Sequence, residues 1–88
     1  MALEGSERKV LHAVLHQQGE ALAGYVDDAQ IAEIADLSIT EVRDCLEILD
    51  GKECVERSVG VGGQSAYITA KGRQELRRTQ VPSGGETQ

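Results

Sequence analysis

The segment from Ser38 to Glu53, SITEVRDCLEILDGKE, constrains the fold most, because it has the start signal and the apolar stripe of a helix. Ser38 followed three residues later by Glu41 is a capping-box pattern, in which each side chain accepts a hydrogen bond from a backbone N–H at the helix start. The stripe residues fall within about 100° of one another on a helical projection and are expected to face the core. They are Val42, Cys45, Leu46 and Leu49.

The side of this helix opposite the stripe carries negative charge. Its members are Thr40, Asp44, Glu47 and Gly51. DNA carries about one negative charge per 1.7 Å of its axis, so it would repel the two carboxylates. The charge of this face therefore argues against a nucleic acid as its partner.

The composition limits the function classes open to the chain. With 88 residues it is expected to form one small domain, and without Phe or Trp its core must be aliphatic. A deep cavity of roughly 300 Å³ or more is not expected in so small a domain. We therefore expect no enzyme activity, no cofactor and no small-molecule substrate.

The net charge of −6 is unevenly distributed along the chain. The segment from Glu20 to Glu56 is strongly acidic, with Arg43 and Lys52 as its basic residues. The segment from Lys71 to Arg78 is basic and is the candidate for a positively charged face. An acidic domain lacks the electrostatic footprint of a nucleic-acid binder, although one basic face is enough for binding.

Two further helices are predicted before Ser38. The first covers Ser6 to about Gln18, where apolar residues recur at helical spacing. A loop bracketed by Gly19 and Gly24 follows, and Tyr25-Val26 is a candidate for a very short strand. The second helix opens on a capping-box pattern and runs to about Asp36. Its pattern residues are Asp27 and Gln30, and Ile31, Ile34 and Ala35 are expected to face the core.

A β-hairpin and a final helix are predicted after residue 53. Cys54–Val61 and Ser65–Thr69 are rich in strand-forming residues, and the glycines at positions 60, 62 and 63 favour a hairpin loop between them. Thr69 is expected to cap a helix over Ala70 to about Thr79, anchored by Leu76. The sequence thus predicts an N-terminal extension over residues 1–5, a folded domain over 6–79, and a flexible tail or linker over 80–88.

The run AQIAEIADLSITEVRDCLEILDGKECVERS resembles the second helix, turn, recognition helix and first wing strand of the winged helix-turn-helix superfamily. YITAKGRQEL, Tyr67–Leu76, looks like the second wing strand and following helix of MarR-like regulators. The resemblance implies a mainly helical α+β fold with three helices, a two-stranded β wing and a short C-terminal helix. In such a family the glycine near the end of the recognition helix usually stands where this chain has Glu53.

The whole pattern also resembles the small winged-helix modules at the N-termini of multidomain bacterial signalling and conflict-system proteins. Such modules precede effector domains and are thought to bring components together by protein–protein contact. This resemblance implies an effector-associated recruitment role, with the tail as a linker to a further domain. A resemblance of fold does not by itself fix the function.

The other residues that could bind a metal ion, react or hold a phosphate form no recognisable site. His12 and His16 lie one helical turn apart, but no third ligand accompanies them, and we expect surface histidines and no metal. Cys45 and Cys54 are expected to be small core residues with neither a disulfide nor a redox role. No catalytic residues are predicted. The glycines around residue 60 lack the Gly-Lys-Ser/Thr ending of a phosphate loop.

Two function hypotheses follow from these patterns. The favoured one is a protein-interaction module that binds a partner protein or a like domain, so that a homodimer is one open alternative. Its expected interaction face comprises Thr40, Glu41, Asp44, Glu47 and Ile48, with Arg73 and Arg77 as a second patch. On its position alone, Ile48 is either an apolar anchor at the exposed face or a residue packed against the wing.

The alternative is a DNA-binding transcriptional regulator that uses the third helix in the major groove. The usual function of this fold motivates it. In this hypothesis, bases or phosphates would be contacted by Ser38, Thr40 and Arg43. The wing loop, however, has no Arg or Lys that could contact DNA. Because no signal peptide, transmembrane run or lipidation motif is present, we expect a cytoplasmic location and no membrane partner.

Overall fold

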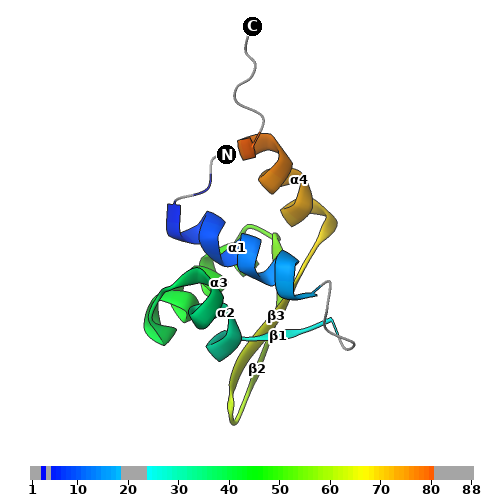
Figure 1. Ribbon diagram of the computed structural model, residues 1–88. Helices are drawn as coiled ribbons and strands as arrows, with labels where there is room; N and C mark the ends of the chain where they lie inside the picture. Colours follow the sequence, from blue (N-terminus) through cyan, green and yellow to red (C-terminus); the bar gives the residue numbers. More distant parts are fainter. Residues whose placement is uncertain (1–2, 4, 19–23, 81–88) are drawn as a thin grey trace, which may run out of the picture.

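The computed structural model describes residues 3, 5–18 and 24–80 (Figure 1). Within them it contains four helices and a three-stranded antiparallel sheet with the strand order β1-β3-β2. The elements are α1 (Gly5–Gln18), β1 (Val26–Asp27), α2 (Asp28–Ala35), α3 (Ile39–Gly51), β2 (Val55–Gly60), β3 (Gly63–Ile68) and α4 (Ala70–Gln80). The predicted mainly helical winged helix-turn-helix fold is confirmed. None of the described helices is both long and apolar enough to cross a membrane.

The three N-terminal helices enclose an aliphatic core against the sheet. The predicted stripe of α3 is buried, and Val10, Leu11 and Val14 of α1 are fully buried. Both tyrosines lie outside this core and contact each other edge to face, with ring centroids 4.9 Å apart. Ile34 of α2 was expected to face the core, and this prediction is wrong because its side chain is 42 % exposed. Ile31 and Ala35 are buried, as predicted, and Asp28 is buried with them.

Helix α3 begins as the sequence predicts. The Ser38 hydroxyl accepts a hydrogen bond from the Glu41 backbone N–H at 3.1 Å, and the Glu41 carboxylate accepts one from the Ser38 backbone N–H at 3.2 Å. The capping box predicted for α2 does not form, because the Asp27 side chain accepts no capping hydrogen bond. Asp27 instead ends β1, opposite Ser65 of β3, and its side chain is exposed.

Helix α3 ends in a left-handed residue at Glu53, which has φ 65°. The Cys54 backbone N–H donates to the Leu49 carbonyl at 2.8 Å, and the Glu53 N–H donates to the Asp50 carbonyl at 3.0 Å. This pair of bonds is a Schellman motif, which usually has glycine at the left-handed position. The family resemblance predicts glycine at position 53, and the left-handed backbone of Glu53 shows that this position does favour glycine.

The predicted hairpin forms the wing, but its loop is shorter than expected. Gly60 and Gly63 are the last pair of the β2–β3 ladder, so that Val61 and Gly62 alone make the turn. The expectation that these two glycines lie in the loop is wrong, because both strands continue to the tip. Gly63 has φ 140°, a conformation that residues with a side chain rarely adopt.

Helix α4 begins at its predicted cap and packs closely on the start of β2. The Thr69 hydroxyl accepts a hydrogen bond from the Gly72 N–H at 3.0 Å and donates one to the Glu53 carbonyl at 2.7 Å. Leu76 is buried, as predicted. A Cβ at Gly72 would clash with the Cys54 carbonyl oxygen and lie 2.8 Å from Cγ1 of Ile68.

The predicted boundaries of the domain, at residues 6 and 79, remain predictions. Leu3 is buried against the core, α1 begins at Gly5, and α4 continues to Gln80. The expected loop between Gly19 and Gly24 lies, up to residue 23, outside the described residues. So do residues 81–88 of the expected tail and residues 1, 2 and 4 of the extension.

We expect Gly72→Ala to lower the free energy of unfolding by about 1–3 kcal/mol, because the new methyl group meets fixed backbone atoms. Gly51→Ala is the matched control, since nothing lies within 4 Å of a Cβ built there. At that helical position alanine should instead stabilise the fold, by about 0.5–1 kcal/mol. Urea unfolding of both variants measures the difference, and equal stabilities would contradict the close approach of α4.

Glu53→Gly should raise the free energy of unfolding by up to about 1 kcal/mol. The left-handed conformation costs a residue with a side chain about 1–2 kcal/mol, which exceeds the extra chain entropy that glycine loses. Glu53→Gln keeps the side chain and removes the charge that lies 3.9 Å from the Lys71 amine. Urea unfolding should show the gain in Glu53→Gly only, and an equal gain in both variants would trace it to the charge.

Candidate functional site

The outer face of α3 is the first surface that the sequence singled out, and its residues are solvent-exposed. They are Thr40, Glu41, Asp44, Glu47 and Ile48, and we call them the α3 face. Ile48 is 44 % exposed. It lies about 140° around the helix from Arg43, which points toward the wing, so the alternative that Ile48 packs against the wing is wrong. An exposed apolar side chain within a charged rim has the composition of a protein contact.

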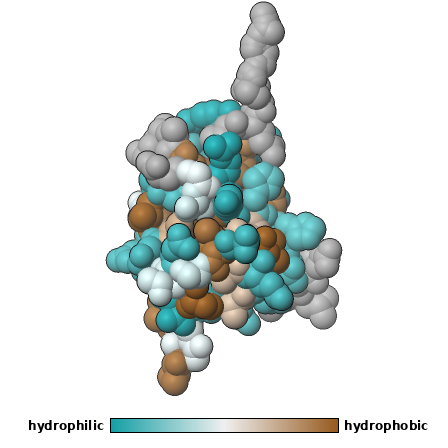
Figure 2. Space-filling model, turned by 60° about the vertical axis from the view of Figure 1, so that its left-hand side comes forward, coloured by the Kyte–Doolittle hydropathy of each residue, from teal (hydrophilic) through white to brown (hydrophobic). Residues whose placement is uncertain are grey.

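The wing adds an apolar tip to the molecule. Val61 is fully exposed and Val59 is 65 % exposed. Figure 2 shows the tip of the wing as a hydrophobic projection at the bottom of the molecule. A wing that inserts into a DNA minor groove uses basic side chains there. The tip of this wing offers valine and glycine instead.

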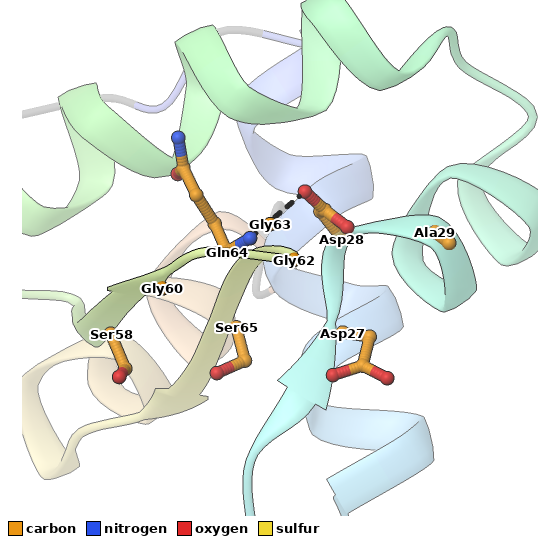
Figure 3. A pocket seen from close by; sticks show the side chains of 9 residues that line it. All are labelled: Asp27, Asp28, Ala29, Ser58, Gly60, Gly62, Gly63, Gln64 and Ser65. Atoms are coloured by element: carbon orange, nitrogen blue, oxygen red, sulfur yellow. Dashed lines mark hydrogen bonds between the residues drawn. The ribbon is translucent and has the colours of Figure 1, made fainter.

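The Asp28 carboxylate at the start of α2 joins three elements. It accepts a hydrogen bond from Nε of Arg43 on α3 at 2.8 Å and another from the Gln64 backbone N–H on β3 at 3.1 Å. Figure 3 shows this carboxylate pointing at the Gln64 backbone. A Cβ at Gly63 would lie only 3.1 Å from the same carboxylate, so the glycine lets the wing approach. We call these contacts the Asp28 bridge.

The Asp28 bridge also sets the charge of its members. Burial of Asp28 acts to raise its pKa, but the hydrogen bonds from Arg43 and Gln64 and the positive charge of Arg43 outweigh burial, so the pKa lies below its ordinary value. Asp28 is therefore ionised at neutral pH, and its charge is opposed by that of Arg43. Sequence reasoning placed Arg43 near a DNA-reading face and missed its partner.

A shallow depression of about 400 Å³ lies beside the Asp28 bridge, between α2 and the wing. Its lining includes Asp27, Asp28, Ser58, Gln64 and Ser65, with the glycines of the hairpin (Figure 3). Carboxylates repel phosphate, so this glycine-rich depression has the wrong charge for a phosphate site.

The other basic residues near α3 are also engaged by carboxylates. Across residues 24–69, all of which the structure describes, the basic residues are Arg43, Lys52 and Arg57. The Lys52 amine lies 2.7 Å from the buried Glu7 carboxylate of α1, and Nε of Arg57 lies 3.5 Å from Asp50. The Glu7 pair was not predicted, although Glu7 precedes Val10, Leu11 and Val14 at the spacing of their buried stripe.

Helix α4 carries the second predicted patch. Arg73 and Arg77 are exposed, together with Ala70 and Gln74 on the same side of the helix. The neighbouring cations Lys71 and Arg78 lie 3.9 Å from Glu53 and 3.5 Å from Glu75. We call Ala70, Arg73, Gln74 and Arg77 the α4 stripe.

The remaining residues with reactive or metal-binding side chains lie apart from these surfaces. Cys45 and Cys54 are buried free thiols, as predicted, and burial raises the pKa of each, so both stay protonated at neutral pH. His12 and His16 are exposed on α1 and line a shallow groove with Ile34. Among the described residues, no group of three potential ligands is placed to hold a metal ion.

We expect Asp28→Asn to lower the free energy of unfolding by about 1–3 kcal/mol at pH 7, toward the lower end because Arg43 is nearly half exposed. The pKa of Asp28 is depressed in the fold, so its stabilisation is complete above the ordinary value of 3.8 and is lost as the pH falls through the folded value.

Urea unfolding at pH 7 and near pH 3 measures this difference, which should shrink in acid. Asp27→Asn is the control, because this neighbouring carboxylate is exposed and caps no helix. A loss of stability in Asp28→Asn that stays the same at both pH values would contradict the role of the ionised carboxylate.

Comparison with known proteins places the chain by its fold. No family model and no curated protein matches the sequence. Among solved structures it resembles BpsR of Bordetella bronchiseptica, whose DNA binding is regulated by 6-hydroxynicotinic acid, with a TM-score of 0.74 and 18 % identity over 89 % of this chain. A MarR-family transcriptional regulator from Silicibacter pomeroyi gives a TM-score of 0.73 and 16 % identity over 89 % of the chain.

These two likenesses cover 53 % and 50 % of the longer proteins, so the chain spans about half their length. The DNA-binding TubR fragment from Clostridium botulinum is instead covered over 99 % of its length, with 90 % of this chain, a TM-score of 0.69 and 22 % identity. The geometry and the comparisons agree that the chain has the winged helix-turn-helix fold.

Proposed function

We propose that this domain is a non-enzymatic recognition module that binds a protein through the α3 face. The observation that carries the proposal is the charge arrangement around α3. Asp44 and Glu47 stand exposed at its centre, while the three basic side chains of residues 24–69 are each held by a carboxylate. A DNA phosphate approaching this face would meet negative charge at close range, where salt screens it least.

The proposed contact also has an apolar component. Ile48 lies on the α3 face beside Asp44, one helical turn away, and its side chain is 44 % exposed. Protein interfaces combine such an apolar centre with a polar rim that fixes orientation. The resemblance to modules of bacterial signalling and conflict systems supports an adaptor role, in which the contact recruits a partner to a larger protein.

The second candidate is a DNA-binding regulator with α3 in the major groove. The comparisons favour this alternative, because BpsR and the TubR fragment bind DNA, the Silicibacter pomeroyi protein is a transcriptional regulator, and all three share the fold. It would use Ser38, Thr40 and Arg43. Ser38 already holds the helix cap, and Nε of Arg43 already holds the Asp28 bridge, so Arg43 would reach a phosphate or a base with its terminal guanidinium nitrogens.

Titration into fluorescent random-sequence duplex DNA at about 50 mM salt tests the proposal, since phosphate contacts are strong at low salt. The unaltered domain should show no binding at micromolar protein concentrations. The double variant Asp44→Lys, Glu47→Lys should bind the same DNA at least tenfold more tightly than the limit that this result sets for the unaltered domain. Micromolar binding by the unaltered domain that falls steeply with salt would overturn the proposal in favour of the regulator.

The matched control for this titration is Glu33→Lys, Glu56→Lys. It makes the same change in net charge at two exposed carboxylates outside α3. An equal gain in both double variants would assign the effect to the overall charge and not to the α3 face. A larger gain from the α3 variant supports this face as the part of the fold that rejects DNA.

A further inference from the structure

Two pairs of like charges remain unpaired on different helices. Within the described residues, Asp44 and Glu47 of α3 form no ion pair, and neither do Arg73 and Arg77 of α4. Each pair lies on adjacent turns of its helix, so its members are neighbours about 5–6 Å apart at their Cβ atoms. The two pairs have opposite charge and similar spacing.

The two charged surfaces belong to different parts of the molecule. Helix α4 packs on α1 and β3 and is seen at the top of Figure 1, whereas α3 packs on α1, α2 and β2. Buried residues of α4 are Gly72, Glu75 and Leu76, which leaves the α4 stripe facing away from the domain. The stripe and the α3 face are therefore both available to another molecule.

We infer that the partner of the α3 face is a second copy of this chain, whose α4 stripe docks on it head to tail. This inference rests on the proposed function and names its partner. Arg73 and Arg77 of one copy pair with Asp44 and Glu47 of the next, and the arginine methylene stems cover Ile48. A head-to-tail contact joins two different surfaces, so each end of a dimer keeps one free surface.

The strength of this contact is bounded by two opposing effects. Opposite patches steer association, but exposed ion pairs add little affinity, and two copies with net charge −6 repel one another. The apolar part is confined to Ile48 and the arginine stems. We therefore expect a dissociation constant on the order of 0.1 mM, in the range of transient contacts.

Sedimentation equilibrium of the full chain tests this inference, from about 10 μM to 1 mM protein at physiological salt. The average mass should rise with concentration and return toward the monomer at about 0.5 M salt, where charges are screened over short distances. One variant, Asp44→Asn, Glu47→Gln, removes the acidic pair, and another, Arg73→Gln, Arg77→Gln, removes the basic pair. Each variant alone should stay monomeric.

An equimolar mixture of these two variants distinguishes head-to-tail docking from other modes. The intact α4 stripe of the first variant meets the intact α3 face of the second, so the mixture should form a one-to-one dimer that does not grow further. Glu33→Gln, Glu56→Gln is the control, and it should associate like the unaltered chain. Thermal unfolding of every variant shows that each is folded.

Three results would overturn the inference: a monomeric unaltered chain at 1 mM, undiminished association of either variant, or a mixture that stays monomeric. A monomeric chain that also fails to bind DNA leaves the proposed protein recognition standing with a different partner. Binding of DNA at low salt overturns the proposed function, whatever the mass of the protein.

Discussion

The Asp28 carboxylate is the contact on which the arrangement of α2, α3 and the wing depends. It lies at the start of α2, but two of its hydrogen-bond donors come from α3 and β3. A buried carboxylate without donors is costly, so the folded chain must bring both donors to it. Arg43 and the base of the wing are therefore held relative to α2 by one group. The hydrophobic core fixes the helices, and Asp28 adds the position of the wing.

Ion pairing inside the fold also determines the charge of the surface around α3. Arg43, Lys52 and Arg57 are each drawn to a carboxylate by the packing of α3 on its neighbours. These pairs neutralise the cations that a DNA-binding winged helix would present near its groove. Among the residues that the structure describes, Asp44 and Glu47 of the α3 face form no ion pair, so this surface keeps their negative charge. The character of this surface thus follows from internal pairing as much as from the residues exposed on it.

Much of the fold could be predicted because its signals are local. The capping box of Ser38 and Glu41 and the stripe of α3 lie within a few turns of one helix, and both are confirmed. The pairs of Asp28 with Arg43 and of Glu7 with Lys52 join residues 15 and 45 positions apart. No periodicity in one helix indicates which distant side chain will meet a buried carboxylate, although its place on an apolar stripe does indicate burial.

The wrong predictions have the same cause, because local sequence patterns do not show which distant residues will meet. Asp27 has the sequence of a helix cap, yet it ends β1 opposite Ser65, and its side chain accepts no capping bond. Gly60 and Gly63 suggested loop residues, yet the ladder continues through them, and Gly63 lies where a side chain would meet the Asp28 carboxylate. Ile34 lies one helical turn from the buried Ile31, but the buried side of this short helix is formed by Asp28, Ile31 and Ala35. In each case a tertiary contact decided between local alternatives.

The exposed surfaces are the part of the molecule that decides its function, because the backbone is shared with proteins that bind DNA. For Arg43 to contact DNA, it must use the guanidinium N–H groups that Asp28 does not engage. The Asp28 carboxylate lies 2.8 Å from Nε and offsets part of the positive charge that would attract a phosphate. The two carboxylates of the α3 face add repulsion that water does not remove at contact distance. Both effects weaken the attraction of DNA in the same place, whereas a basic partner protein would satisfy the carboxylates of the α3 face directly.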